Sequence, residues 1–274
     1  MAFSVDVNKV QGTLGDPIQV RPRLTSTLLV MTLNEIEGMK AVMPSIKREW
    51  VDQLIILDGG STDGTIEWAR EQGYEVYVQK NPGFRSAYQE IWPRITGDVV
   101  IYFTPDGNSI PQVIPQLLSE MERGYDLVIA SRYLDGARSE DDDAVTRFGN
   151  WMFRFLANRL LRPRGSARLT DPLVMLRAHR TDLPNRLGLD RAEPFERLER
   201  FFKTRVDWIP LMSMRVLKHG LLWKEIPADE PARIGGERKL KIFKWGAVYL
   251  AQLFREWFSG DRAIPILKKE SRCF

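Results

Sequence analysis

The chain has 274 residues, of which 43% are hydrophobic and 28% charged, so it holds enough apolar material for one large domain or one domain with an appendage. This composition excludes a disordered, collagen-like or low-complexity chain, and a net charge of +4 makes the protein only mildly basic. The single cysteine, Cys273, excludes a disulfide framework and a cysteine zinc site, and the presence of only two histidines argues against a His-rich metal centre or a Ser/His/Asp triad.

The first half of the chain alternates between strand-like and helix-like segments after a polar arm over 1–22 that we expect to be flexible. Strands are predicted at 24–33, 52–58, 74–79, 98–104 and 125–131, and helices at 35–46, 62–73, 84–92 and 111–124. Because each connection is short, this order predicts an α/β fold with a doubly wound, mostly parallel, Rossmann-like sheet. Neither a GxGxxG motif nor a phosphate-binding GxxxxGK[ST] loop is present, so dinucleotide and P-loop binding are not indicated.

The second half predicts a long amphipathic helix over 140–161, a short strand within 169–180, helices over 194–220 and a strand at 221–228. The segment 237–261 is helical by pattern and rich in aromatic residues. We therefore predict three parts: an N-terminal arm (1–22), a catalytic domain (23–236) and a C-terminal amphipathic helical appendage (237–274).

Polar side chains stand where several predicted strands end. Asp58 opens a glycine-rich turn and could accept hydrogen bonds from a base or a ribose. Asp106 and Asn108, one residue apart, offer two oxygen ligands of the kind that suits Mg²⁺ or Mn²⁺ under a diphosphate. Because the carboxyl ends of parallel strands meet at one edge of the sheet, we expect these loops to converge there.

The same residues also have a simpler interpretation. Asp-Gly-Gly-Ser and Asp-Gly-Asn are ordinary turn sequences, so each loop taken alone is typical of turn chemistry. Four arginines near predicted loops could bind phosphate through bidentate contacts, although arginines are usually solvated: Arg85, Arg132, Arg177 and Arg233. Only the joint placement of these residues at strand ends favours a binding site.

Six blocks in order carry a resemblance to a known family. They read VMTLNEIEGM, IILDGGSTDGTIEWA, YFTPDGNSIPQVIPQLL, LVIASRYLDGARS, LTDPLVMLRAHR and ARIGGERKL. With them the chain resembles the inverting family 2 glycosyltransferases of GT-A fold, and within these the dolichyl-phosphate mannosyltransferase and polyprenyl-phosphate glycosyltransferase group. The resemblance spans about residues 26–245.

The resemblance implies a role for each matching residue. The nucleotide sugar would be held by Asn34, Glu35, Asp58, Gly60, Ser61, Arg85, Pro105 and Asp106. Phosphate or acceptor would be bound by Ser131, Arg132, Arg177, Arg233 and Lys239. The family's metal, Mg²⁺ or Mn²⁺, would take Asp106 and Asn108 as ligands, and the catalytic residues would be Asp106, Asp171 and Arg132.

Four positions depart from the family pattern. Gly59 replaces the second aspartate of the family's Asp-Asp-Gly-Ser motif, so we expect one contact to the nucleoside to be missing or supplied elsewhere. Asn108 and Ile110 replace an aspartate and a polar ligand at the metal site, so we expect weaker metal binding or greater reliance on the substrate phosphates. Arg238 replaces a serine before Lys239 and adds positive charge.

The implied reaction is an in-line displacement at the anomeric carbon with inversion, from GDP-mannose or a UDP-sugar. A polyprenyl phosphate acceptor is already ionised near neutral pH and needs no general base. A sugar hydroxyl would need a carboxylate base. Asp171 is the best candidate for that base, and the run Asp141–Asp143, more typical of a helix start, supplies weaker ones. A soluble transferase acting on a glycan or small molecule and a non-catalytic sugar-nucleotide-binding protein remain as alternatives.

The C-terminal third bears on the acceptor. Residues 191–274 hold 18 Lys and Arg against 11 Asp and Glu, so any anionic partner should meet the chain there. Within 237–258, basic residues lead into an aromatic helix, which would either pack on the catalytic domain, lie in a lipid interface or bind a protein. We expect neither a signal peptide nor a membrane span, no nucleic-acid partner, and a cytoplasmic location or a peripheral one on the cytoplasmic face of a membrane. The oligomeric state is left open.

Overall fold

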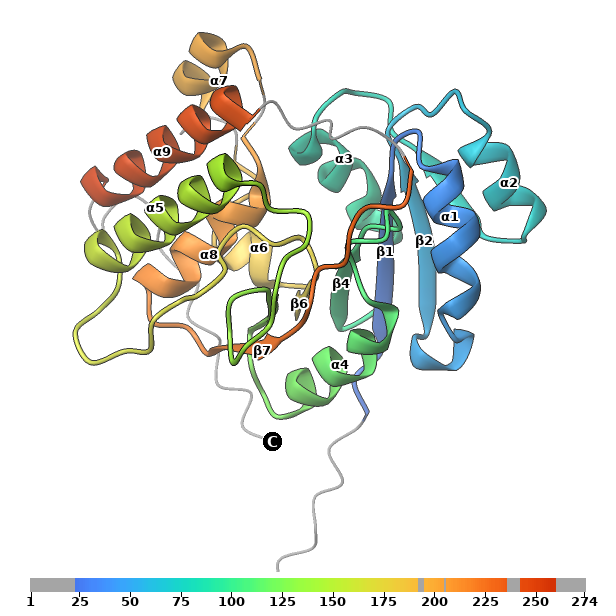
Figure 1. The fold of residues 1–274 in the computed structure, drawn as a ribbon, viewed down its shortest axis with the longest axis horizontal. Helices are drawn as coiled ribbons and strands as arrows, with labels where there is room; N and C mark the ends of the chain where they lie inside the picture. The colour runs from blue at the N-terminus through green and yellow to red at the C-terminus, as the bar shows by residue number, and fades with distance from the viewer. Residues whose placement is uncertain (1–22, 192–194, 205, 236–241, 260–274) are drawn as a thin grey trace, which may run out of the picture.

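A computed structural model describes residues 23–191, 195–204, 206–235 and 242–259 (Figure 1). Its seven-stranded sheet has the order β3-β2-β1-β4-β6-β5-β7. The strands are β1 (Ser26–Thr32), β2 (Gln53–Asp58), β3 (Glu75–Val78), β4 (Val99–Phe103), β5 (Leu127–Ser131), β6 (Arg177–Arg180) and β7 (Trp223–Pro227). The predicted α/β fold with a mostly parallel sheet is confirmed, and the exception to parallel pairing is β6, which runs antiparallel to both β4 and β5.

Helices cover both faces of the sheet. They are α1 (Ile36–Val42), α2 (Thr65–Glu71), α3 (Phe84–Ile91), α4 (Ile114–Glu122), α5 (Ala144–Leu160), α6 (Leu183–Arg186), α7 (Glu196–Phe202), α8 (Trp208–Lys218) and α9 (Ile242–Phe258). Single 3₁₀ turns occupy Met43–Ser45, Arg48–Trp50, Trp92–Arg94 and Pro111–Val113. Within these described ranges, none of the helices combines the length and apolar character that crossing a membrane requires.

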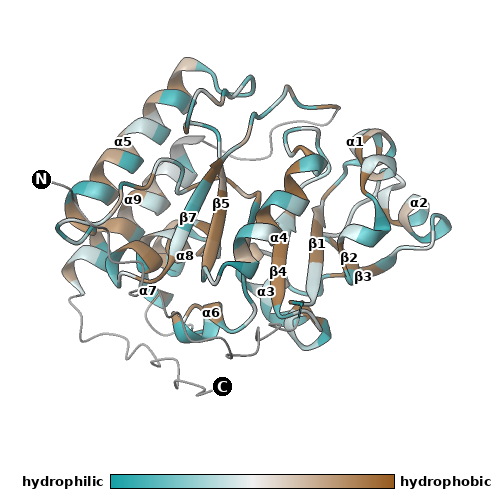
Figure 2. Ribbon diagram, turned by 90° about the horizontal axis from the view of Figure 1, so that it is seen from below, coloured by the Kyte–Doolittle hydropathy of each residue, from teal (hydrophilic) through white to brown (hydrophobic). Residues whose placement is uncertain are grey.

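The central strands are buried on both faces, as their continuous apolar runs predict. Figure 2 shows β4 and β5 largely in the brown of hydrophobic residues. Along β1, Leu29 and Met31 pack on the side of α3 and α8, while Leu28 and Val30 pack on the side of α1 and α4. This alternation follows from the two-residue period of a strand, which sends successive side chains to opposite faces. The sheet therefore sits between two apolar cores.

Helix α9, the described part of the predicted C-terminal appendage, lies beside α5 and packs on α8 (Figure 1). Val248 and Leu253 are fully buried in this contact. The Arg215 guanidinium of α8 donates to both carboxylate oxygens of Glu256, at 3.1 and 2.9 Å, and both side chains are at most 2% exposed. Moving α9 away from α8 would leave the buried Arg215 charge without a partner, which is costly. This ion pair therefore holds α9 on the domain.

His179 of β6 is buried beside two aromatic rings. Its imidazole stacks on Trp92 at 6.0 Å and meets the Tyr102 ring edge-on at 5.0 Å. Nδ1 lies 2.7 Å from the backbone carbonyl oxygen of Arg180, which fits a neutral ring that donates from Nδ1. Burial disfavours the imidazolium and lowers the pKa of His179 to about 4.

We predict that His179 makes the fold sensitive to mild acid. The unfolded chain takes up this proton below pH 6.5 and the folded chain only below about 4, so the unfolded state binds more protons between these values and stability falls as the pH falls. The free energy of unfolding should drop by about 2 kcal/mol between pH 7 and pH 5 from this group alone. Urea unfolding at both pH values, compared with His179→Gln, measures it. An equal pH dependence in the variant would contradict the assignment.

Candidate active site

The turn after β4 carries the predicted metal ligands. Gly107 adopts φ 91°, a left-handed conformation that glycine tolerates best. The turn is closed by Asp106, whose Oδ1 accepts from the Asn108 backbone N–H at 3.2 Å. Helix α1 packs tightly against it, since a Cβ at Gly38 would lie 2.3 Å from the carbonyl oxygen of Pro105. The position of the Asp106 carboxylate therefore depends on a close helix contact.

A segment that follows β7, residues 231–235, crosses this turn, and we refer to it as the strap (Figure 1). The Ile234 N–H donates to the carbonyl oxygen of Asp106 at 2.7 Å. The Arg233 guanidinium lies 2.9 Å from Asp106 Oδ2 and 3.6 Å from Glu35 Oε1. Gly235 lies against Glu37, where a Cβ would meet that carboxylate at 2.1 Å. Arg233 thus joins the loops that follow β1 and β4 through their carboxylates.

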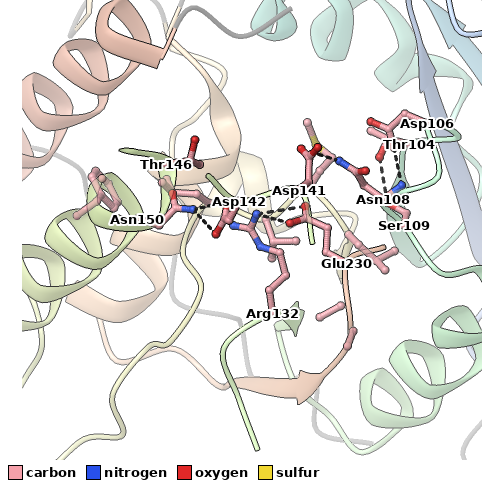
Figure 3. A pocket seen from close by; sticks show the side chains of 18 of the residues that line it. Thr104, Asp106, Asn108, Ser109, Arg132, Asp141, Asp142, Thr146, Asn150 and Glu230 are labelled. Carbon is pink, nitrogen blue, oxygen red and sulfur yellow. Dashed lines mark hydrogen bonds and ion pairs between the residues drawn. The ribbon is translucent and has the colours of Figure 1, made fainter. Parts of the chain in front are cut away.

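Asn108 is oriented by a residue from a distant loop. Its Nδ2 donates to Asp141 Oδ2 at 3.2 Å, and Figure 3 shows the two side chains pointing toward each other. Its Oδ1 is buried and has no hydrogen-bond partner among the described residues. Because Nδ2 is engaged and Oδ1 is not, Asn108 offers its Oδ1 oxygen to a cation or to a hydrogen-bond donor of a ligand.

Arg132, at the end of β5, forms a buried ionic network. Its Nε donates to Asp171 Oδ2 at 2.7 Å and its Nη2 donates to Oδ1 at 3.0 Å, while Nη1 donates to Glu230 Oε2 at 3.0 Å. Burial opposes the charged form, but the Asp171 carboxylate holds the pKa of Arg132 well above its ordinary value. Burial raises the pKa of Glu230. Both oxygens of Asp171 are occupied, and its side chain is 1% exposed.

These groups form the polar end of a cavity of about 320 Å³ (Figure 3). The polar lining residues include Asp106, Asn108, Arg132, Asp141, Asp142, Asn150, Asp229, Glu230 and Arg233. The other end of the cavity is mostly apolar, and its lining comes from α3, α5, α9 and the loop before β6, with Asp207 as its charged member, accepting from the Tyr249 hydroxyl. It is lined by Phe84, Gly149, Met152, Phe153, Leu173, Val174, Met175, Gly246, Tyr249 and Leu250. We call this end the apolar branch.

The predicted nucleotide residues of the first two loops lie together beside the strap, outside the lining of this cavity. The Asn34 N–H donates to Ser61 Oγ at 2.8 Å, and Asn34 Oδ1 accepts from the Thr62 N–H at 2.8 Å. Asp58 is buried and accepts from the N–H groups of Gly60 and Ser61 at 2.8 and 2.7 Å. In this structure Asp58 shapes the turn with both oxygens, and Gly60 and Asn34 are the exposed members of the group.

Several predicted residues are not brought to the cavity. Arg85 is buried and pairs with Glu199 at 2.9 Å. Arg177 is fully buried and donates to backbone carbonyls and to Ser213 Oγ, and burial lowers its pKa to about 10. Ser131 is also buried, with its hydroxyl 2.6 Å from that of Thr170. Lys239 lies outside the described residues.

The acidic run before α5, which the sequence indicated only as a weaker source of a general base, supplies residues to the site. Asp143 is the helix cap that the run predicted, since its Oδ1 accepts from the Thr146 N–H at 2.7 Å. Asp142 accepts from the Tyr133 hydroxyl, and Asp141 accepts from Asn108. Glu230 was not predicted, although it stands three residues before Arg233 and directly precedes the strap.

Comparison with known proteins identifies the family. Residues 27–179 match glycosyl transferase family 2, which is more than half of the chain. The chain therefore belongs to glycosyltransferase family 2, a family of nucleotide-sugar-dependent enzymes, as its motifs predicted.

Individual relatives are distant. The chain is 23% identical to the polyprenol monophosphomannose synthase of Mycolicibacterium smegmatis over 270 residues, covering 89% of this chain and 95% of that protein. It is 32% identical to the glycosyltransferase AglJ of Haloferax volcanii over 133 residues, but this match covers only 47% of the chain and 44% of AglJ. It is 28% identical to the dolichol-phosphate mannosyltransferase of Pyrococcus furiosus over 123 residues, covering 42% and 35%.

Solved structures share the fold. Glucosyl-3-phosphoglycerate synthase of Mycobacterium tuberculosis, in complex with phosphoglyceric acid, is similar with a TM-score of 0.56 and 21% identity, covering 86% of this chain and 80% of that one. A second structure of the same enzyme, with Mn²⁺ and UDP-glucose, gives a TM-score of 0.53 at 21% identity, covering 86% and 79%. These likenesses support the GT-A-like fold.

We predict that Gly38→Ala damages the site through the backbone. The new Cβ would overlap the Pro105 carbonyl, and such overpacking costs about 1–3 kcal/mol, more than the gain in helix propensity. Thermal unfolding should show destabilisation together with weaker nucleotide binding. The matched control is Gly149→Ala in α5, where a Cβ meets nothing within 4 Å and helix propensity should stabilise the protein. Equal stability changes in the two variants would refute the close-contact argument.

Proposed function

We propose that this protein transfers a sugar from a nucleotide-diphosphate sugar to a polyprenyl phosphate. The observation that carries the proposal is the two-part cavity. Its polar end lies at the strand-end carboxylates, and its apolar branch leads away between α5 and α9. A sugar-phosphate group fits the first part by charge and hydrogen bonding, and an isoprenoid chain fits the second by hydrophobic contact.

The donor would bind on the side of the strap where the loops after β1 and β2 meet. Asn34, Glu35 and Gly60 would face the nucleoside there, while Asp58 and Ser61 hold the turn. The relatives named for polyprenol and dolichol phosphate mannose synthesis favour GDP-mannose, and the solved complex with UDP-glucose favours a UDP-sugar.

A divalent cation fits the turn after β4. Asp106 supplies a carboxylate and Asn108 an unpartnered buried oxygen, the ligand types that Mg²⁺ and Mn²⁺ prefer. In the described ranges no three His, Cys, Asp or Glu side chains come together as a metal site, so the substrate phosphates and water would have to complete the coordination. When bound, the ion would neutralise charge on the leaving diphosphate.

The chain's own residues would divide the remaining tasks. Arg233 now neutralises Asp106 and Glu35, and the incoming diphosphate would take over its guanidinium as a bidentate partner. Arg132 would fix the floor of the cavity through Asp171 and Glu230. Because a phosphate acceptor needs no general base, the full engagement of Asp171 with Arg132 is compatible with this reaction, whereas a hydroxyl acceptor would have to rely on another carboxylate such as Asp141.

A small soluble acceptor is the second candidate. It is favoured by the fold shared with a synthase solved in complex with phosphoglyceric acid, an anionic small molecule. Such an acceptor would fill the polar end and leave the apolar branch unused. Parallel transfer assays with GDP-mannose and UDP-glucose, using a polyprenyl phosphate in detergent or 3-phosphoglycerate, separate the two. Transfer to 3-phosphoglycerate alone would overturn the first proposal.

We predict that Asp106→Ala lowers sugar transfer by about a hundredfold or more, because charge stabilisation at the leaving group is worth several kcal/mol. The variant should also lose Mn²⁺ binding measured by isothermal titration, while its circular dichroism stays unchanged. The matched control is the exposed Asp190→Ala, which should keep both. An Asp106→Ala enzyme that remains active would show that the metal assignment is wrong.

We predict that Gly149→Phe discriminates between acceptors. The new ring would project into the apolar branch, so kcat/KM for a long polyprenyl phosphate should fall about tenfold or more, as overpacking costs of about 1–3 kcal/mol imply. Hydrolysis of the nucleotide sugar should be unchanged, because the donor side lies beyond the strap. Gly149→Ala serves as the control for the backbone change. Undiminished transfer to the long acceptor would place the isoprenoid chain elsewhere.

A further inference from the structure

An aromatic face is exposed on α5. Phe148, Trp151 and Phe155 follow at helical spacing and are 60%, 50% and 54% exposed. Their rings contact one another along the helix, with centroids 5.8 Å apart in both successive pairs. The opposite side of the same helix buries Phe153 and Ala157 in the core, so α5 is held in place while this face stays outside. A contiguous exposed aromatic patch of this kind marks an interaction surface.

The segment that carries the aromatic face is positively charged throughout. Residues 144–170 contain six arginines and neither Asp nor Glu. Four of these arginines are exposed: Arg147, Arg159, Arg164 and Arg168. Arg159 lies one turn beyond Phe155 on the same side of the helix, so aromatic and cationic groups share one surface. Aromatic residues beside arginines are the combination that binds the interface of an anionic bilayer.

We propose that the aromatic face of α5 docks the protein on an anionic lipid surface. The positive charge of residues 144–170 favours an anionic membrane over a second copy of the chain as the partner of this face. A symmetric contact with a second copy would bring two arginine-rich segments together, and like charges would oppose it. An anionic membrane satisfies both features, because the rings enter the headgroup region while the arginines meet lipid phosphates.

Docking in this way would bring the active site to the lipid. The adjacent face of α5 contributes Gly149, Asn150, Met152 and Phe153 to the cavity, so the apolar branch opens beside the docking helix. Delivery of an acceptor from the bilayer to this branch rests on the proposed function, whereas docking itself rests on the aromatic face and the arginines alone. The two can therefore fail separately.

Substitution of exposed residues tests the surface better than truncation, because removal of α9 would take Glu256 away from the buried Arg215. The full chain and Phe148→Ser/Trp151→Ser/Phe155→Ser are sedimented with phosphatidylcholine vesicles with and without phosphatidylglycerol. The matched control is Phe201→Ser/Leu222→Ser, two exposed apolar residues at other places on the surface. A third variant, Arg159→Gln/Arg164→Gln/Arg168→Gln, tests the charge.

The unaltered chain should bind the phosphatidylglycerol vesicles and release them as salt rises, as electrostatic attraction to anionic lipid requires. Both the aromatic and the arginine variants should bind about tenfold or more weakly, and the control should bind like the unaltered chain. Circular dichroism and nucleotide binding confirm that each variant is folded. Equal binding by all variants would overturn the proposal, as would concentration-dependent dimers that the aromatic variant abolishes without any vesicle binding. Vesicle binding without transfer to polyprenyl phosphate in detergent would support docking and reject the proposed acceptor.

Discussion

The arrangement of the candidate active site depends on one buried cation, the Arg132 guanidinium. It connects the end of β5 with Asp171, in the loop before β6, and with Glu230, after β7. Glu225 of β7 in turn accepts from the N–H groups of Thr170 and Asp171, at 2.8 and 2.7 Å. Removing one member of such a network leaves a buried charge without a partner, which costs about 3–5 kcal/mol. The network therefore fixes both the floor of the cavity and Glu230, the residue that precedes the strap.

The placement of the strap follows from this network. Glu230 is held by Arg132, and three residues later Arg233 reaches Asp106 while Ile234 hydrogen bonds to the backbone of the same turn. The strap thus lies between the cavity and the loops that follow β1 and β2. Under the proposed function the nucleoside and the acceptor would bind on opposite sides of this segment, which would let them approach the reacting carbon from different sides.

Much of this architecture could be predicted from local sequence. Continuous apolar runs predicted the parallel strands, and polar residues after them predicted the edge where Asp106, Asn108 and Arg132 gather. The antiparallel direction of β6 could not be predicted from sequence. Arg177–Arg180 is only four residues long, and its direction depends on its pairing with β4 and β5. The strand is also polar, and its Arg177 is satisfied by tertiary contacts with Ile209 and Ser213 of α8, which no periodic pattern reports.

Side-chain partners far apart in sequence could not be predicted. Arg85 lies on α3, just after β3, where an arginine could reach a site at the strand ends. It pairs instead with Glu199 in the interior, 114 residues later in the chain. Arg177 is drawn to carbonyl oxygens of its own loop and of α8. Asp141 is part of a run whose composition indicates a helix start, and only the fold brings it to Asn108. In each case the residue type indicated a charged or polar contact. The partner, however, is determined by the tertiary fold, which brings distant segments together.

The distribution of charge shows the same dependence on the fold. Summed by sequence, the positive surplus belongs to residues 191–274, and this sum predicts that an anionic partner meets the C-terminal third of the chain. In the structure, α9 uses Glu256 and Tyr249 to bind the domain, and the arginine-only stretch lies instead on and after α5. The acidic residues at 140–143 offset part of that charge in a sequence average, but Asp141 and Asp142 line the cavity, while Asp143 caps α5 and Glu140 is exposed. Because Asp141 and Asp142 face the cavity and the arginines of 144–170 follow on and after α5, one helix can form a wall of the candidate site and present a cationic, aromatic face outside.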